Sequence, residues 1–251
     1  MKHDDRQVRS IGDYIAALRD TTNDRMVWFR GQKRLDWKLL PNIARPTEAK
    51  PEGSMDEEGA AIKRFKQNAG AFIDRIPGDI WEWIFLMQHH RGVTRLLDWS
   101  ESPLVALYFA LEQDAEGQDA VVWCLDPMEL NAHAGHNRKN PRDVLAFGID
   151  EALDNYAPER VSQKDAVMAP VAAIGPRNSR RMVAQSGTFT IIHADPKPIE
   201  EVKDASHIWR LVIPNDSKHN IRQELKIVGF NKFMLFPDLE TLAIYTKELL
   251  E

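Results

Sequence analysis

Apolar residues recur along the chain with two different periods, which predict both helices and strands. Helical spacing occurs over residues 10–19, 55–75, 80–90, 216–228 and 238–249, and in a segment that begins at Ser102. Short runs of bulky or β-branched residues predict strands over residues 26–30, 119–125, 167–173, 188–193, 207–213 and 232–236. Helices and strands alternate irregularly without a convincing linker, so we expect a single α+β domain in which helices flank a mixed or antiparallel sheet.

The clearest helix is predicted after Ser102, which can cap it, because Pro103 suits a first helical turn. Its core face is dense with apolar residues: Leu104, Ala106, Leu107, Phe109 and Ala110. In the helix predicted over 55–75, one face is formed by Ile62, Phe65, Ala69 and Phe72. The stretch from 41 to 54, which holds three prolines, is predicted to be an exposed loop, and residues 131–165 a loop-rich insertion with short helices.

The composition is that of a soluble domain with a substantial core. The chain has 251 residues, of which 43% are hydrophobic, and we treat residues 1–251 as one domain with its core between about 10 and 250. A single cysteine excludes an internal disulfide framework, and the polar amino terminus does not resemble a signal peptide. No apolar run reaches membrane-spanning length. We therefore expect a cytoplasmic protein with no membrane partner.

The overall charge restricts the class of ligand only partly. A formal net charge of -5 and a pI near 5.9 argue against a generally basic surface that coats nucleic acid. A local basic groove is still compatible with these values. Candidate sites therefore have to be sought in individual clusters of polar residues.

Arg30 ends the first predicted strand, within the sequence Trp28-Phe29-Arg30-Gly31-Gln32. An arginine among large apolar residues needs an anion, because an unpaired buried guanidinium is costly and its fork matches a carboxylate or phosphate. Gly31 allows a backbone to approach closely, so that Arg30 can reach an anion beside it. The alternative is that Arg30 pairs with an internal carboxylate such as Asp98 or Glu224.

The segment from Gln88 to Ser102 mixes two histidines, two arginines and two acids with large apolar residues. Such a mixture predicts polar side chains that converge in a partly buried pocket. The segment ends at a helix amino terminus, whose free N–H groups favour phosphate or carboxylate. Alternatively, it is a hydrogen-bonded structural network in which Asp98 and Ser102 cap the helix.

A third cluster spans residues 180–190. Arg180 and Arg181 precede a glycine-broken strand, in which Phe189 is placed to stack on a planar ring. The alternative is a surface helix end followed by an ordinary strand, because paired arginines are commonly solvated.

Metal chemistry has weaker support. His133 and His136, with Cys124 or His89, offer nitrogen and sulfur ligands, but no CxxC pair or HExxH helix is present. We expect no metal site and interpret Cys124, which lies in an apolar strand, as an inert core thiol.

Taken in order, these clusters resemble the FRG domain family, named for the Phe-Arg-Gly at residues 29–31. The matching motifs are Trp28–Gln32, Gln88-His89-His90 leading to Thr94–Ala110, Ala184–Phe189 and Phe236–Leu239. The resemblance covers the chain from about residue 10 onward. Arg91-Gly92-Val93 departs from the Gly-Leu-Pro that is usual before Thr-Arg-Leu-Leu-Asp-Trp, a difference that we interpret as a loop change without chemical consequence.

Genes of this family are often associated with bacterial mobile elements and phage defence, and the layout of the motifs is similar to that of ADP-ribosyltransferases. The resemblance implies a fold like that of those enzymes, with NAD as the substrate and a defence-associated or toxin-like role. It also implies a protein or nucleic-acid acceptor and an antitoxin or other defence partner.

The same resemblance assigns roles to residues. Arg30 or Arg95 is expected to clamp the pyrophosphate, and Phe189 or Trp99 to stack on nicotinamide. The residues expected to bind NAD are Phe29, Arg30, Gly31, Gln32, His89, His90, Thr94, Arg95, Trp99, Ser102 and Phe189. Those expected to serve catalysis are Arg30, Asp98, Ser100, Gln185 and Glu224.

Gln185 stands where those enzymes place a carboxylate, and an amide cannot act as a general base. Asp98 or Glu224 is expected to supply the carboxylate from elsewhere. Otherwise the domain is a noncatalytic module that binds a nucleotide or nucleic acid in the same pocket. A third interpretation makes Arg30 and Arg95 structural, each paired with a buried carboxylate.

Overall fold

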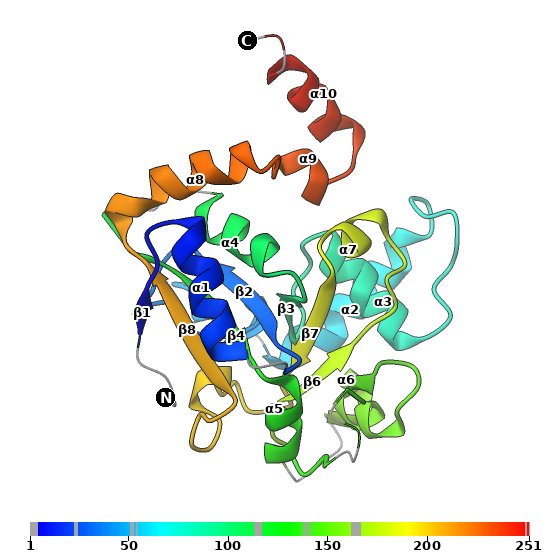
Figure 1. Cartoon of the computed structure of the whole chain (residues 1–251). Coiled ribbons are helices and arrows are strands. Elements are labelled where there is room, and N and C mark those ends of the chain that lie inside the picture. Colours follow the sequence, from blue (N-terminus) through cyan, green and yellow to red (C-terminus); the bar gives the residue numbers. More distant parts are fainter. Residues whose placement is uncertain are drawn as a thin grey trace.

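A computed structural model describes residues 5–22, 25–50, 53, 55–112, 117–137, 140, 142–161, 167–248 and 250. In this part of the chain, helices cover an eight-stranded mixed sheet, as expected for an α+β fold (Figure 1). None of the described helices has the length and hydrophobicity that crossing a bilayer requires.

The sheet consists of two four-stranded halves, in the order β1-β8-β4-β2 and β3-β7-β6-β5. The strands of the first half are β1 (Arg6–Gln7), β8 (Ile208–Ile213), β4 (Ala120–Leu125) and β2 (Trp28–Gln32). Those of the second half are β3 (Leu96–Ser100), β7 (Gly187–Ile191), β6 (Val171–Ile174) and β5 (Leu145–Ala146). The pairs β1–β8 and β5–β6 are parallel, and the remaining pairs are antiparallel.

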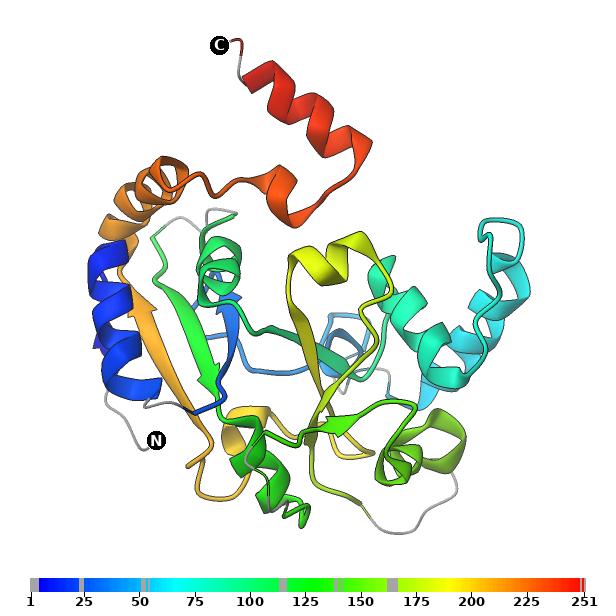
Figure 2. The same ribbon diagram turned by 45° about the vertical axis from the view of Figure 1, so that its right-hand side comes forward.

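The two halves meet at a single residue pair, Phe29 with Ser100. β2 pairs with β4 along its whole length, and β3 pairs with β7 along its whole length. Since β2 and β3 share only one pair, they separate beyond it, and Figure 2 shows the two halves diverging. This separation creates space at the centre of the sheet.

One face of the first half is covered by α1 (Ile11–Thr22), α4 (Pro103–Leu111) and α8 (Lys218–Ile227) (Figure 1). Their shared core includes Tyr14, Phe29, Leu107, Val122, Cys124, Leu211 and Ile221. On the second half, α2 (Glu58–Ala69) and α3 (Ile80–His89) contribute to a separate core with Leu96, Phe147, Tyr156 and Phe189. Paired residues of neighbouring strands point to the same face, so the Phe29–Ser100 pair places α4 and α3 on one side of the sheet.

The opposite face carries one core that spans both halves. It contains Trp28 and Trp123 from the first half together with Leu97, Trp99 and Ala172 from the second. Loop residues that include Leu39, Ile43, Ile199 and Val202 complete it. This continuous core holds the two halves together where backbone pairing is lacking.

Gly31 is required by the close approach of α4 to β2. A Cβ atom at this position would lie 1.9 Å from the carbonyl oxygen of Ala106 and 2.5 Å from the amide nitrogen of Ala110. The predicted close approach of a backbone is therefore present, and the approaching backbone is that of the helix after Ser102.

Two sequence-based predictions were wrong: the strand over residues 232–236 and the end of the helix over residues 55–75. Residues 232–236 form no strand: α9 (Lys232–Leu235) begins after Asn231, whose side chain accepts a hydrogen bond from the Met234 amide. A short apolar run cannot distinguish helix from strand by period, and here the cap at Asn231 and the proline at 237 favour a helical turn. The helix predicted to 75 ends at Ala69, and Phe72 is 86% exposed.

The segments predicted to be irregular contribute to the cores. Ile43 and Ala44 are buried in the supposed exposed loop, within η1 (Asn42–Ala44). The insertion after residue 131 contains η3 (Glu151–Tyr156), α6 (Pro158–Val161) and buried apolar residues such as Leu153. The other described elements are α5 (Pro127–His133), α7 (Arg180–Ala184), α10 (Leu239–Glu248), η2 (Met55–Glu57), η4 (Ile199–Glu201) and η5 (Asn215–Ser217).

Gly31→Ala is expected to destabilise the fold, because its methyl group collides with helix backbone rather than with a flexible side chain. Overpacking of this kind costs about 1–3 kcal/mol of unfolding free energy, and a backbone collision belongs at the upper end. Gly59→Ala is the matched control, since Gly59 lies in α2 with no atom near its added Cβ. The control should gain about 0.5–1 kcal/mol. Equal unfolding free energies of both variants in urea titrations would contradict this packing.

Candidate functional site

A cavity of about 410 Å³ lies where β2 and β3 separate. Helices α3, α4 and α7 line it from one face of the sheet, and Arg30, Gln32 and Trp99, which point to the other face, line it as well. Its walls come from β2, β3, β7, α3, α4 and α7, and from the loop that follows β2. These elements are far apart in the sequence, and the split in the sheet brings them together.

Arg30 reaches across the gap between the two strands. Its Nη1 donates a 2.6 Å hydrogen bond to the backbone carbonyl of Asp98 on β3. Its Nε is buried without a hydrogen-bond partner, and among the described residues Arg30 forms no ion pair with a carboxylate. Burial lowers the pKa of Arg30 to about 10, and the nearby Asp98 carboxylate partly opposes this shift. The guanidinium is therefore not neutralised by an internal ion pair with Asp98 or Glu224.

Two further arginines line the same cavity. Arg45 lies at its exposed rim, where its Nε donates to the carbonyl of Leu40. Arg181, on α7, is half-buried, and its Nη1 approaches the carbonyl of His89 at 3.5 Å. Desolvation lowers the pKa of both guanidinium groups, and the Asp98 carboxylate opposes the shift in each.

Asp98 is the carboxylate at the centre of these arginines. Because side chains alternate along β3, the Asp98 side chain points to the face of the sheet that carries α3 and α4 and lines the cavity there. Leu97 and Trp99 point to the core on the opposite face. Its Oδ2 accepts a 3.0 Å hydrogen bond from Nε2 of Gln88, and the hydroxyl of Thr94 donates to Oε1 of the same glutamine. Asp98 is exposed to the cavity and its orientation is set by Gln88.

The lining of the cavity is positively charged, in contrast to the acidic chain as a whole. Among the described lining residues, the cations are Arg30, Lys33, Arg45 and Arg181, and the carboxylates are Asp98 and Glu112. The pKa of His89 is lowered, first by burial and then by Arg181 and His90, so that its neutral form is favoured at pH 7. The arrangement favours an anionic ligand.

The aromatic residues of the cavity differ in accessibility. Phe189 packs against Phe85 in the core of the second half, with ring centroids 4.9 Å apart. Trp99 is buried, and its indole donates to Thr190. Trp37 is 40% exposed, and Nζ of Lys33 lies 5.3 Å from its ring centroid. Trp37 therefore offers the most accessible ring surface.

The fold brings together most of the residues predicted for the site. The cavity is lined by Phe29, Arg30, Gly31, Gln32, His89, Asp98, Trp99, Ser100, Gln185 and Phe189. The predicted residues that do not line it are His90, Thr94, Arg95, Ser102 and Glu224. Sequence reasoning assigned no role to Trp37, Arg45, Gln88, Glu112 or Arg181, although Gln88 and Arg181 lay within segments that it singled out.

Arg95 lies in a buried ion pair outside this cavity. Its Nε donates to Glu58 at 2.5 Å, and its Nη2 donates to the carbonyl of Tyr156 at 2.6 Å. The side chains of Arg95 and Glu58 are only 2% and 3% exposed. The structural interpretation therefore fits Arg95, because each of its three guanidinium nitrogens has a protein acceptor and it does not line the cavity that contains Arg30.

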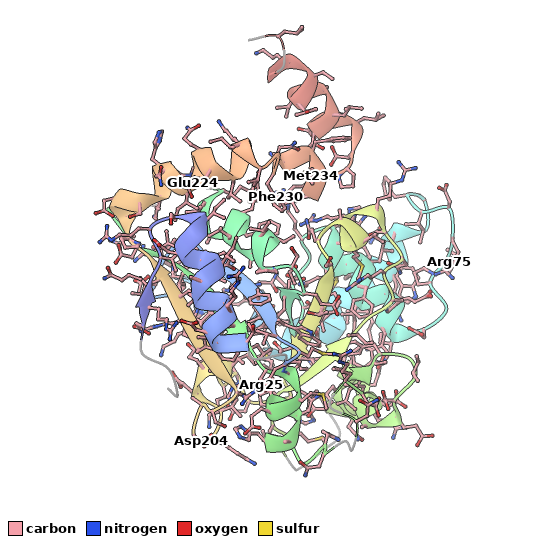
Figure 3. All side chains as sticks on the ribbon, viewed as in Figure 1. Arg25, Arg75, Asp204, Glu224, Phe230 and Met234 are labelled. Atoms are coloured by element: carbon pink, nitrogen blue, oxygen red, sulfur yellow. The ribbon has the colours of Figure 1, made fainter. Side chains whose placement is uncertain are left out.

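Glu224 is also placed elsewhere, on α8, where Figure 3 shows it on the side of the molecule that carries α1. Its Oε2 accepts a 2.6 Å hydrogen bond from the amide of Ile11, the first residue of α1. A carboxylate at a helix amino terminus satisfies a free N–H group and the helix dipole. Glu224 thus links two helices, and Asp98 supplies the carboxylate near Arg30.

Ser100 and Gln185 line the cavity but have structural hydrogen bonds. The Ser100 hydroxyl donates to the carbonyl of Gln185 at 2.7 Å and accepts from the Ser102 amide. The Gln185 amide donates to the carbonyl of Leu235 at 3.0 Å. Ser102 precedes α4 without a side-chain cap bond, so the cap predicted for it is wrong, and its own amide is held by the Ser100 hydroxyl.

Two further predicted residues, Gln32 and His90, differ in their surroundings. The Gln32 side chain is buried and accepts a 2.9 Å hydrogen bond from the indole of Trp123. His90 is exposed beside His89, at the end of α3.

Among the described residues, no group of three or more His, Cys, Asp and Glu side chains is arranged to hold a metal ion.

Comparison with known families gives one match. Residues 25–119 match the model of the FRG domain. The matched range includes β2, β3 and α4, and hence Arg30 and Asp98, whereas α7 and β7 lie beyond it. No curated protein and no solved structure matches the chain.

Replacing Arg30 or Arg95 by alanine is expected to change the free energy of unfolding by different amounts. Arg95→Ala should lower the unfolding free energy by about 3–5 kcal/mol, because it leaves the Glu58 carboxylate buried and unpaired. Arg30→Ala removes one charge-assisted hydrogen bond to a carbonyl, leaves no buried carboxylate unpaired, and should cost less, about 1.5–3 kcal/mol. Urea unfolding of both variants measures the difference. A larger loss for Arg30→Ala would show that Arg30 is the structural residue.

Proposed function

Because the chain contains an FRG domain over residues 25–119, we propose that its arginine-lined cavity binds NAD and that the protein transfers ADP-ribose to a protein or nucleic-acid acceptor. The observation that carries this proposal is an excess of positive charge around the accessible carboxylate of Asp98. A role in phage defence or as a toxin, with a cognate antitoxin or other defence partner, belongs to the same proposal.

The charge and shape of the cavity suit a dinucleotide. The diphosphate of NAD would bind Arg30, Arg45 and Arg181, because guanidinium groups form paired hydrogen bonds with phosphate oxygens. Trp37 offers an exposed face for a planar ring, since Phe189 and Trp99 are already packed. A volume of about 410 Å³ lies within the range of small-molecule sites.

Asp98 is the residue best placed for the chemistry. In the transfer, the bond between nicotinamide and ribose C1′ breaks, and nicotinamide leaves with the bonding electron pair. The acceptor then forms a bond to C1′ and gives its proton to the Asp98 carboxylate, which acts as general base. As in glycoside cleavage, the transition state has oxocarbenium character, which a nearby carboxylate stabilises.

A noncatalytic module is the second candidate, and the position of Gln185 favours it. The Gln185 amide is bound to the Leu235 carbonyl, so this residue neither abstracts a proton nor is free to orient an acceptor. On this alternative, the same arginines bind a nucleotide or nucleic acid, and Asp98 only sets the position of the ligand. Saturable binding without product distinguishes it from the enzyme.

Asp98→Asn is expected to abolish transfer while NAD still binds. Loss of a general base lowers the rate by roughly 10²–10⁴-fold, whereas the amide keeps the size of the side chain. Incubation with labelled NAD and cell lysate, followed by assays of nicotinamide release and of transferred label, measures the effect. Release of nicotinamide at the wild-type rate by Asp98→Asn would exclude Asp98 as the base. No release by the wild-type protein would exclude the enzyme.

Arg30→Ala is expected to weaken binding of NAD by about tenfold or more, because a charge-assisted hydrogen bond to phosphate contributes about 1.5–3 kcal/mol. Arg75→Ala is the matched control: this exposed arginine pairs with Glu82 and lies at the edge of the molecule in Figure 3. Isothermal titration of NAD into each protein gives the affinities. Equal losses in both variants would indicate a nonspecific effect of charge, and unchanged affinity in Arg30→Ala would remove Arg30 from the site.

A further inference from the structure

The carboxyl-terminal arm of the chain contacts the candidate site, although it lies outside the FRG domain match. The arm consists of α9, the turn Phe236-Pro237-Asp238 and α10, and Figure 1 shows it above α4 and α7. We propose that Phe236 is a positioning residue that holds Arg181 in the cavity, and thus that the arm completes the anion site. This inference rests on the proposed function of that cavity.

The side chain of Phe236 lies between two residues that line the cavity. The guanidinium carbon of Arg181 is 4.7 Å from the centroid of its ring, within the range of a cation–π interaction. The ring of Phe109, on α4, meets that of Phe236 edge to face at 5.9 Å and 86°. Phe236 therefore bridges α4 and α7 at one wall of the cavity.

Arg181 has few other contacts that fix its position. Its hydrogen bond to the carbonyl of His89 is long, at 3.5 Å, and among the described residues it forms no ion pair with a carboxylate. A long arginine side chain has many rotamers, and ordering it costs entropy when the ligand binds. Contact with the Phe236 ring limits this freedom and keeps the charge available to an anion.

The arm is itself fixed against α7 and by its own turn. The Gln185 amide, at the end of α7, donates to the carbonyl of Leu235. In the turn, the Thr241 hydroxyl donates to the carbonyl of Phe236, and Oδ1 of Asp238 accepts a 2.8 Å hydrogen bond from the Thr241 amide. These bonds fix the turn and so hold the ring of Phe236 beside Arg181. They also explain what Phe236 and Asp238 do in the Phe-Pro-Asp sequence: the first contacts Arg181, and the second stabilises the turn.

Replacement of the ring tests the proposal without removing the arm. Phe236→Leu retains an apolar side chain but has no π face for the guanidinium, whereas Phe236→Tyr retains the face. We expect Phe236→Leu to weaken NAD binding by about three- to thirtyfold, which is the range expected for loss of a partly buried cation–π contact. Phe236→Tyr should bind NAD with the wild-type affinity. Phe233→Leu is the matched control, since Phe233 stacks on Tyr245 in the same arm. Thermal melting of each variant reports whether the fold is retained.

A second readout works in the absence of any ligand. The Nε–H resonance of Arg181 can be assigned by its loss in Arg181→Lys, and we expect the ring current of Phe236 to shift it, because the guanidinium carbon lies 4.7 Å from the ring centroid. The shift should disappear in Phe236→Leu and persist in Phe236→Tyr and Phe233→Leu. If wild-type protein binds no NAD but the resonance behaves in this way, the proposed ligand is wrong and the positioning role stands. An Arg181 resonance that is unchanged in Phe236→Leu overturns the inference. If the wild-type protein binds NAD, equal NAD affinities of Phe236→Leu and Phe233→Leu overturn it as well.

Discussion

The separation of β2 from β3 after one residue pair is the constraint on which the candidate site depends. Phe29 and Ser100 join the two halves of the sheet, and the core on the opposite face keeps them from parting. On the other face, α4 is drawn onto β2 because Gly31 has no side chain to exclude it. The cavity forms because backbone pairing between β2 and β3 stops after one residue pair, while the apolar core on the opposite face still holds the two halves together. The polar residues at the gap therefore line a cavity and do not pair across a continuous sheet.

Two arginines that look equivalent in the sequence have opposite roles in the fold. Arg95 is enclosed by Glu58 and backbone carbonyls, which satisfy its charge and connect α2 to β3. Arg30 meets a single carbonyl, and its Nε remains unpaired in a cavity that also contains Arg45 and Arg181. Arg30 is thus a half-buried cation whose acceptor among the described residues is a neutral carbonyl, whereas the charge of Arg95 is matched by a carboxylate.

The sequence predicted the class of fold, and many of the residues that it singled out line one cavity, because those features depend on local patterns. Apolar periodicity located most helices and strands, and the motifs around Arg30 and Asp98 drew attention to the two strands that carry these polar groups, although both residues lie at the centre of a strand rather than at its end. The short apolar run before Pro237 was misread because period alone does not separate a single helical turn from a strand. The partners of Arg95 and Glu224, and the presence of Arg45 in the cavity, follow from tertiary packing that a single sequence does not specify.

The most direct test of the proposed site is a crystal structure determined after soaking with NAD. We expect the diphosphate to lie within hydrogen-bond distance of the Arg30 and Arg181 guanidinium groups, with the ribose directed to the Asp98 carboxylate. Density for NAD at another place on the surface, or a cavity closed by an ion pair between Arg30 and Asp98, would contradict it.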